Sequence, residues 1–248
     1  ADFVDDDDRV MLALAASLET LALRGVGGVA HSACLLGVLE ALTTAEDRAV
    51  RVRTAQTLKA LLAAPGLPLA VYTEIAALAD RAARSEWFTA RASAAALLPA
   101  VHAATPIVAA ASTASAASAS SETASSAETA AAVDAKMAAL RTLFYGLCAD
   151  AMPTVRRAAA TALVELVPGI PGGARAVAAQ VLPVLHALAA DAQDSVRFLA
   201  VDVAVAVANA LGLSDDDKNE ENEEDSEKAG NRKTVETTVS GLMEDRSW

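Results

Sequence analysis

Aromatic residues, histidine and cysteine are all scarce in this sequence. Phe, Trp and Tyr together make up 3% of the 248 residues, and there are three histidines and two cysteines. Two cysteines are too few for the disulfide framework of a small secreted domain. We therefore expect Cys34 and Cys148 to be reduced and buried, in a protein of the cytoplasm and also of the nucleus.

Signatures of catalysis and of metal binding are missing as well. His31, His102 and His186 lie far apart and in no metal-ligand spacing, so each is expected to be a core or helix-end residue. No nucleophile stands beside a general base, and no glycine-rich phosphate-binding motif occurs. The sequence therefore predicts no enzyme, no metal site and no cofactor.

Positive charge is also in short supply. The chain has 20 basic and 32 acidic residues, a formal net charge of -12, whereas a nucleic-acid-binding surface should be basic. Much of the negative charge lies in residues 214–230, which hold nine acids and two lysines. The longest stretch without charged residues, 92–121, is rich in Ala, Ser and Thr and contains two prolines. We expect it to be too weakly hydrophobic to span a membrane.

Alanine, by contrast, is abundant at about a quarter of all residues, and it is the strongest helix former. Apolar residues also recur at the i, i+3, i+4, i+7 spacing of a helix with one buried face. Residues 155–167 show this pattern at Val155, Ala158, Ala159, Ala162, Leu163 and Leu166. The sequence therefore predicts an all-α protein.

The predicted helices form a repeat that is marked by arginine. Arg51, Arg91, Arg156 and Arg197 each stand near the start of a helix that follows a short polar turn. The first two are 40 residues apart and the last two 41 residues apart. A period near forty with two helices per unit is typical of HEAT repeats. We predict an α-solenoid of HEAT repeats, in which antiparallel helix pairs form a right-handed superhelical array.

The predicted boundaries follow from this repeat. The chain is interpreted as one solenoid fragment that begins and ends inside repeats, with a low-complexity insert at 109–135 and an acidic insert at 213–233. Neither insert has enough branched apolar residues to offset the entropy of ordering it. The predicted partial repeats cover 7–24 and 234–248, and the complete ones cover about 30–64, 68–104, 136–168 and 174–212.

Several polar and aromatic residues fall at the turns inside the helix pairs. Trp87 and Trp248 could be buried, but their shared position beside acids and arginines favours contact with a partner. Asp47, Asp150 and Asp194 stand at equivalent turns, where helix capping and partner contact are both compatible with the sequence. We expect the repeat arginines, together with Arg157, to pair with turn acids of the same or the adjacent repeat.

Three segments of the chain resemble a known family. The segment WFTARASA at 87–94, the segment LCAD followed by PTVRRAAA at 147–160, and the segment QDSVRFLAV at 193–201 resemble the scaffold (A) subunit of protein phosphatase 2A. The terminal EDRSW at 244–248 is similar to the start of that family's next repeat. The motifs occur in the right order, so the resemblance is more specific than the helical period alone.

The resemblance implies a non-catalytic scaffold that corresponds to the N-terminal part of the family. It implies that the turns inside the repeats bind phosphatase regulatory (B-type) subunits, and that the catalytic subunit would bind only through repeats missing from this chain. A HEAT-repeat transport or coat adaptor that binds cargo peptides or a small GTPase is the alternative. The implied partner-binding positions are Glu46, Asp47, Trp87, Phe88, Asp150, Pro153, Arg156, Arg157, Asp194, Ser195 and Trp248.

Overall fold

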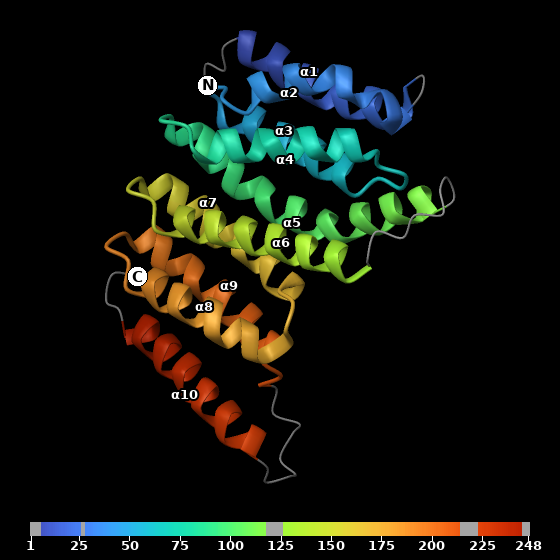
Figure 1. Cartoon of the computed structure of the whole chain (residues 1–248). Coiled ribbons are helices and arrows are strands. Elements are labelled where there is room, and N and C mark those ends of the chain that lie inside the picture. Colours follow the sequence, from blue (N-terminus) through green and yellow to red (C-terminus); the bar gives the residue numbers. More distant parts are fainter. Residues whose placement is uncertain (1–5, 26–27, 118–125, 214–222, 245–248) are drawn as a thin grey trace. The chain divides into compact units, whose positions relative to one another are not determined.

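The prediction of an all-α fold is confirmed in the part of the chain that the structure describes. The computed structural model describes residues 6–25, 28–117, 126–213 and 223–244, which contain helices and no β-strand. They form two compact units, Ala1–Phe144 and Tyr145–Trp248. The α-helices (Figure 1) are α1 (Asp6–Arg24), α2 (Leu36–Leu42), α3 (Arg48–Leu62), α4 (Leu69–Ala83), α5 (Phe88–Ala117), α6 (Ser126–Cys148), α7 (Pro153–Leu166), α8 (Gly173–Ala189), α9 (Asp194–Ala210) and α10 (Glu223–Glu244).

The first unit is built from helix pairs in layers. Helix α2 packs on α3, and α4 packs on α5, each pair being joined by a short turn. The second helices also stack on one another, because α1 packs on α3 and α3 packs on α5. The largest fully buried side chains of this unit include Leu58 of α3, Ile75 of α4 and Leu98 of α5. Each layer therefore buries its apolar stripe against a neighbouring layer, as expected for repeats that cannot bury a core alone.

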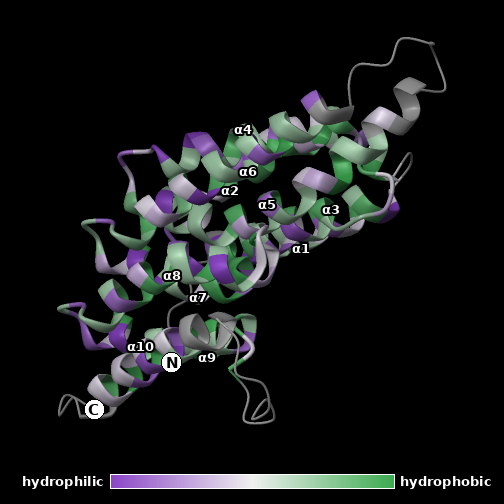
Figure 2. Cartoon of the chain, turned by 60° about the horizontal axis from the view of Figure 1, so that its bottom comes forward, coloured by the Kyte–Doolittle hydropathy of each residue, from purple (hydrophilic) through white to green (hydrophobic). Residues whose placement is uncertain are grey.

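The second unit shows the same arrangement. Helix α8 packs on α9, α7 packs on α9, and α10 lies against both α8 and α9. Its core includes Leu163 of α7, Leu185 of α8 and Val203 of α9, all buried. Figure 2 shows hydrophobic residues along the helices and hydrophilic residues at many of the exposed turns. This is the amphipathic pattern that the apolar spacing predicts.

The repeat arginine marks the same structural position four times. Helices α3, α5, α7 and α9 begin at Arg48, Phe88, Pro153 and Asp194. Each of these residues stands three positions before a repeat arginine. The spacing of the arginines in the sequence is therefore the same as the spacing of the helix starts. Pro153 suits this place, because the first position of a helix has no hydrogen-bond partner for its N–H group.

Helices extend into both of the predicted inserts. Helix α5 continues to Ala117 through Pro99 and Pro106, and α6 already begins at Ser126. The high helix propensity of alanine explains this extension. Helix α10 begins at Glu223, inside the predicted acidic insert, where acids favour the N-terminal end of the helix dipole.

The first predicted helix pair also differs from expectation. A 3₁₀ helix, η1 (Gly28–Leu35), precedes the short α2. Within η1 the hydroxyl of Ser32 donates a hydrogen bond to the carbonyl of Val29, and the thiol of Cys34 donates one to the carbonyl of His31. Such hydrogen bonds from side chains to nearby carbonyls compete with the backbone hydrogen bonds of a regular α-helix. The prediction that both cysteines are buried is wrong for Cys34, which is exposed, whereas Cys148 is buried; both are free.

Helix α5 is more hydrophobic than expected from the sequence for residues 92–121. Its segment Phe88–Ala111 is long and apolar enough to cross a membrane by length and composition. More than half of that segment is buried within the protein, as in the core helix of a soluble protein. Val101, for example, is fully buried, and the hydroxyl of Tyr72 on α4 lies 2.7 Å from that of Thr105 on α5.

Candidate docking turns

The sequence-predicted site residues gather at four turns that join the two helices of a pair. We call these the docking turns. They comprise residues 43–47, 84–87, 149–152 and 190–193, which precede α3, α5, α7 and α9. The first two belong to one compact unit and the last two to the other, and each unit is considered by itself.

In the first unit, the repeat arginine closes each docking turn. The guanidinium of Arg51 donates hydrogen bonds to the carbonyls of Ala45 and Glu46, at 2.6 and 2.5 Å. Arg91 does the same to Ser85 and Glu86, at 2.9 and 2.8 Å. These carbonyls would otherwise face solvent at an irregular turn, so the arginines hold the turn backbone in one conformation. Charge assistance strengthens each bond.

The first docking turn is also bonded to α5, the helix that follows the second turn. The hydroxyl of Ser93 on α5 donates a hydrogen bond of 2.7 Å to the carbonyl of Thr43, which begins the first turn. Below it, Arg81 on α4 forms an exposed ion pair of 2.8 Å with Glu40 on α2. The first bond is buried and resists competition from water, so it contributes more to holding the first docking turn against α5.

In the second unit, an ion pair joins the two docking turns. Arg156 donates from Nε and Nη2 to the two carboxylate oxygens of Asp191, at 2.6 and 2.8 Å. Its Nη1 donates to the carbonyls of Asp150 and Ala151, at 2.8 and 3.1 Å. The side chains of Arg156 and Asp191 are only 15% and 8% exposed. One guanidinium therefore fixes its own turn and the next.

The hydrogen bonds of this ion pair favour the charged form of both residues. The hydrogen bonds from Arg156 lower the pKa of Asp191 below its ordinary value, against the opposing effect of burial. The same bonds raise the pKa of Arg156. The carboxylate of Asp191 also accepts from the backbone N–H of Gln193 at 2.8 Å. Arg197 in turn donates to the carbonyl of Asp191 at 2.6 Å and forms a 2.8 Å ion pair with Asp194.

The predicted pairing of repeat arginines with turn acids thus takes two forms. In the second unit Arg156 and Arg197 form ion pairs with the carboxylates of Asp191 and Asp194. In the first unit Arg51 and Arg91 donate hydrogen bonds to backbone carbonyls. Asp191 was not among the predicted site residues, although it is the acid that joins the two turns. Its sequence signal was available, because Asp191 precedes Arg197 by six residues, as Asp150 precedes Arg156.

The three turn aspartates are not equivalent. Asp47 is the N-cap of α3, and its carboxylate accepts a 2.9 Å hydrogen bond from the N–H of Val50. Asp150 accepts from the N–H of Met152 inside its turn, and Asp194 is already the first residue of α9. The capping interpretation therefore holds for Asp47 and is wrong for the other two.

The capping bond has a measurable consequence. We expect Asp47→Ala to lower the free energy of unfolding by about 1 kcal/mol, because the N–H of Val50 loses its acceptor. Urea unfolding followed by circular dichroism measures this change. Glu46→Ala is the control, since Glu46 is exposed and its carbonyl, which the substitution keeps, is what Arg51 binds. Equal losses in both variants would contradict the capping role.

Exposed apolar side chains stand beside these turns. Trp87 is 72% exposed, which excludes the interpretation that it is a buried core residue. Phe88 follows it with partial exposure. Met152 occupies the position equivalent to Trp87 before α7 and is also exposed, although sequence reasoning did not single it out. Large exposed side chains on a fixed backbone are well suited to bury area against a partner.

The remaining predicted residues are mostly accessible. Glu46, Arg157, Asp194 and Ser195 are exposed, and Asp47, Asp150, Pro153 and Arg156 are partly buried. Trp248 lies outside the described residues. Within each unit the structure thus brings the predicted residues of two neighbouring turns together, whereas continuity of the turns across the two units stays a prediction, as does the superhelical hand.

No group of three or more His, Cys, Asp and Glu side chains in the described part of the chain could hold a metal ion. His102 is buried and touches Arg141, whereas His31 and His186 are exposed. The docking turns present exposed apolar and charged side chains, among them Trp87, Met152 and Glu46.

Comparison with known proteins points to one family. No family model matches the chain. It is 31% identical over 209 residues to the regulatory A-type subunit of protein phosphatase PP2A from Schizosaccharomyces pombe, covering 84% of this chain and 30% of that protein. It is 32% identical over 164 residues to the beta isoform of the 65 kDa regulatory A-type subunit of serine/threonine-protein phosphatase 2A from Rattus norvegicus, covering 66% of this chain and 22% of that protein.

The chain is a homologue of part of the phosphatase 2A scaffold (A) subunit. It spans less than a third of the length of these relatives. Both are named as regulatory subunits of the phosphatase. Among solved structures, a designed armadillo repeat protein aligns with 96% of the chain and 96% of its own length, at 13% identity and a TM-score of 0.42.

Proposed function

We propose that this chain is a non-catalytic scaffold segment of a protein phosphatase 2A complex, which binds regulatory (B-type) subunits through its docking turns. The observation that carries the proposal is the exposed Trp87 on a turn whose backbone is fixed by Arg91, in a homologue of the phosphatase scaffold. The catalytic subunit would bind through repeats beyond those present here. The cytoplasm, and also the nucleus, are the proposed compartments.

The physical argument rests on preorganisation. A surface that is already ordered loses little entropy when a partner binds, so more of its contact energy appears as affinity. Arg51 and Arg91 order the turn backbones of the first unit, and Arg156 orders those of the second. Exposed Trp, Phe and Met side chains on these turns provide contact area, and the turn acids provide charge selectivity.

Trp87→Ala tests the apolar part of this surface. We expect the affinity for purified regulatory (B-type) subunits to fall at least about tenfold, as for a central interface tryptophan, while thermal unfolding stays unchanged. Surface plasmon resonance with the immobilised chain measures the association rate and the dissociation rate of the regulatory subunit, and so its affinity. Ile107→Ala is the matched control, since Ile107 is also exposed but lies far along α5 from the turn. Equal affinities for wild type and Trp87→Ala would refute the proposed role of this turn.

Asp194→Arg tests the charged part in the other unit. Asp194 is exposed and pairs with Arg197, so reversing its charge changes the surface presented to a regulatory partner. We expect slower association and weaker capture, with a dependence on ionic strength. The control is Asp134→Arg, which makes the same charge reversal at an exposed residue of α6 away from the docking turns. If the two reversals weaken capture equally, overall charge and not the docking turn explains the effect.

A further inference from the structure

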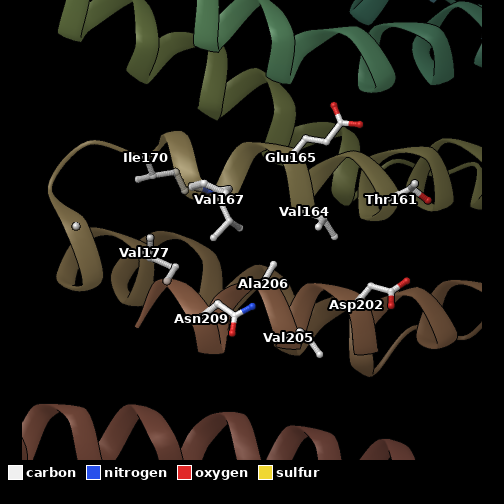
Figure 3. A pocket seen from close by; sticks show the side chains of 13 residues that line it. Thr161, Val164, Glu165, Val167, Ile170, Val177, Asp202, Val205, Ala206 and Asn209 are labelled. Carbon is white, nitrogen blue, oxygen red and sulfur yellow. The ribbon is translucent and has the colours of Figure 1, made fainter. Parts of the chain in front are cut away.

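The second unit contains an apolar groove that the proposed function does not use. It lies between α7 and α9, is closed at one end by η2 (Val167–Gly169) and the start of α8, and has a volume of about 850 Å³ (Figure 3). Its walls include Val164, Val177, Val205 and Ala206. Val205 is 57% exposed and contributes apolar surface to the wall on α9.

The groove is separate from the docking turns of the same unit. Those turns precede the first residues of α7 and α9, whereas the groove follows the second halves of both helices, from Thr161 and from Asp202 onwards. The wall on α9 runs from Asp202 to Ala210, about 12 Å at the rise of an α-helix. This is long enough to hold two turns of a helix or a few residues of extended chain.

The charged groups of the groove have one sign. The two described lining residues that carry charge, Glu165 and Asp202, are both acidic. Figure 3 shows Asp202 at one end of the groove and the apolar Ile170 and Val177 at the other. An apolar floor with an acid at one end favours a ligand with the complementary pattern, because opposite charges at a partly desolvated edge attract and like charges repel.

We propose that this groove binds a segment of a partner protein that presents apolar side chains next to a lysine or arginine. The apolar side chains would cover Val164, Val205 and Ala206, and the cation would lie against Asp202. The acidic stretch of the chain itself, residues 214–230, carries the wrong charge for this site. The occupant is therefore a basic segment of another protein, bound independently of the docking turns.

The test uses a defined probe in place of the unknown partner. A fluorescein-labelled helical peptide of leucine and lysine is titrated with the whole chain, and binding is followed by fluorescence anisotropy at physiological ionic strength. A peptide of the same length made of leucine and glutamate is the charge control. We expect the lysine peptide to bind at least tenfold more tightly, with shifts of the methyl signals of Val164, Val177 and Val205 in NMR spectra.

Two variants with matched controls locate the binding site. Val205→Arg and Asp202→Lys should each weaken the lysine peptide at least tenfold. Val10→Arg on α1 and Asp134→Lys on α6 make the same changes at exposed positions of the other unit and should leave its affinity within twofold. All four positions are exposed, so circular dichroism spectra should stay unchanged.

Several outcomes would overturn the proposal. They are the absence of lysine-peptide binding at millimolar concentration, equal binding of the glutamate peptide, and equal weakening by all four variants, which would show only attraction to an acidic protein. A doubled mass in light scattering that Val205→Arg abolishes would show instead that a second copy of the chain covers the groove. Capture of regulatory subunits by the same variants is a separate measurement, so failure here leaves the docking turns tested on their own.

Discussion

Asp191→Ala is expected to lower the free energy of unfolding of the second unit by about 3 kcal/mol. The substitution leaves the guanidinium of Arg156 at a mostly buried site without its two carboxylate acceptors. It also removes the acceptor of the Gln193 N–H and so loosens the turn before α9. Urea unfolding followed by circular dichroism measures the loss, which is large compared with that of an exposed ion pair.

The stabilisation by Asp191 should also depend on pH in a defined direction. Its pKa is lowered in the folded protein, so the folded state binds the proton less readily than the unfolded chain, whose ordinary value is 3.8. The ion pair therefore contributes fully above that value, and its contribution is lost as the pH falls through the lower folded pKa. We expect the difference between wild type and Asp191→Ala to be constant from pH 5 to 7 and to shrink in stronger acid.

A double-mutant cycle separates the ion pair from other effects. Arg156→Met removes the same pair but also the bonds to Asp150 and Ala151, so its loss should be at least as large. The double variant should lose less than the sum of the two single losses, with a coupling of about 1–3 kcal/mol. Additive losses would show that Arg156 and Asp191 do not stabilise each other.

The sequence predicted the helical period and the helix starts well, because both depend on local chemistry. The spacing of Arg51, Arg91, Arg156 and Arg197 marks the starts of four helices. The apolar stripe predicted for residues 155–167 is buried at Val155, Ala159, Ala162, Leu163 and Leu166. Ala158, on the same predicted stripe, is only partly buried, since the edge of a stripe depends on where the neighbouring helices lie.

Helix lengths were predicted less well. The repeat predicted for about 68–104 places the end of the helix after Trp87 near residue 104, yet α5 continues through Pro106 to Ala117. A proline removes one hydrogen bond, and the alanines around it offset that cost. The roles of the turn acids were uncertain for a different reason: a shift of one to three residues decides whether an aspartate caps a helix, as Asp47 does, or accepts from the arginine of a neighbouring repeat, as Asp191 does.

Contacts between helices away from the docking turns could not be found from the sequence. His102 on α5 and Arg141 on α6 are 39 positions apart, and nothing in the local pattern relates them. Lys136 lies over the ring of Tyr72, 4.5 Å from its centre, and these two residues are also far apart in the sequence. Such pairs depend on how the helices are placed in space. His102 and Arg141 are both buried, so the loss of either polar group should be costly.

The contact between His102 and Arg141 leads to the second large effect. Nη1 of Arg141 lies 3.1 Å from Nε2 of His102, whose residue is 1% exposed. Burial, and next the charge of Arg141, lower the pKa of His102 from 6.5 to about 4. The ring is therefore neutral at pH 7 and can accept a hydrogen bond from the guanidinium. The folded state takes up a proton less readily than the unfolded chain, so stability is complete above pH 6.5 and falls from there down to about pH 4.

We expect the wild-type chain to lose about 2 kcal/mol of unfolding free energy from this histidine between pH 7 and pH 5. His102→Gln keeps an oxygen acceptor for Arg141 but cannot take up the proton, so the loss over that range should disappear in this variant. His102→Leu removes the acceptor and should already be destabilised by about 2 kcal/mol at pH 7. Working above pH 5 keeps the titration of Asp191 out of the measurement, because the pKa of that carboxyl lies below 3.8. An unchanged pH dependence in His102→Gln would mean that the buried imidazole is not the group that titrates, and a leucine variant as stable as wild type would mean that Arg141 does not need it as an acceptor.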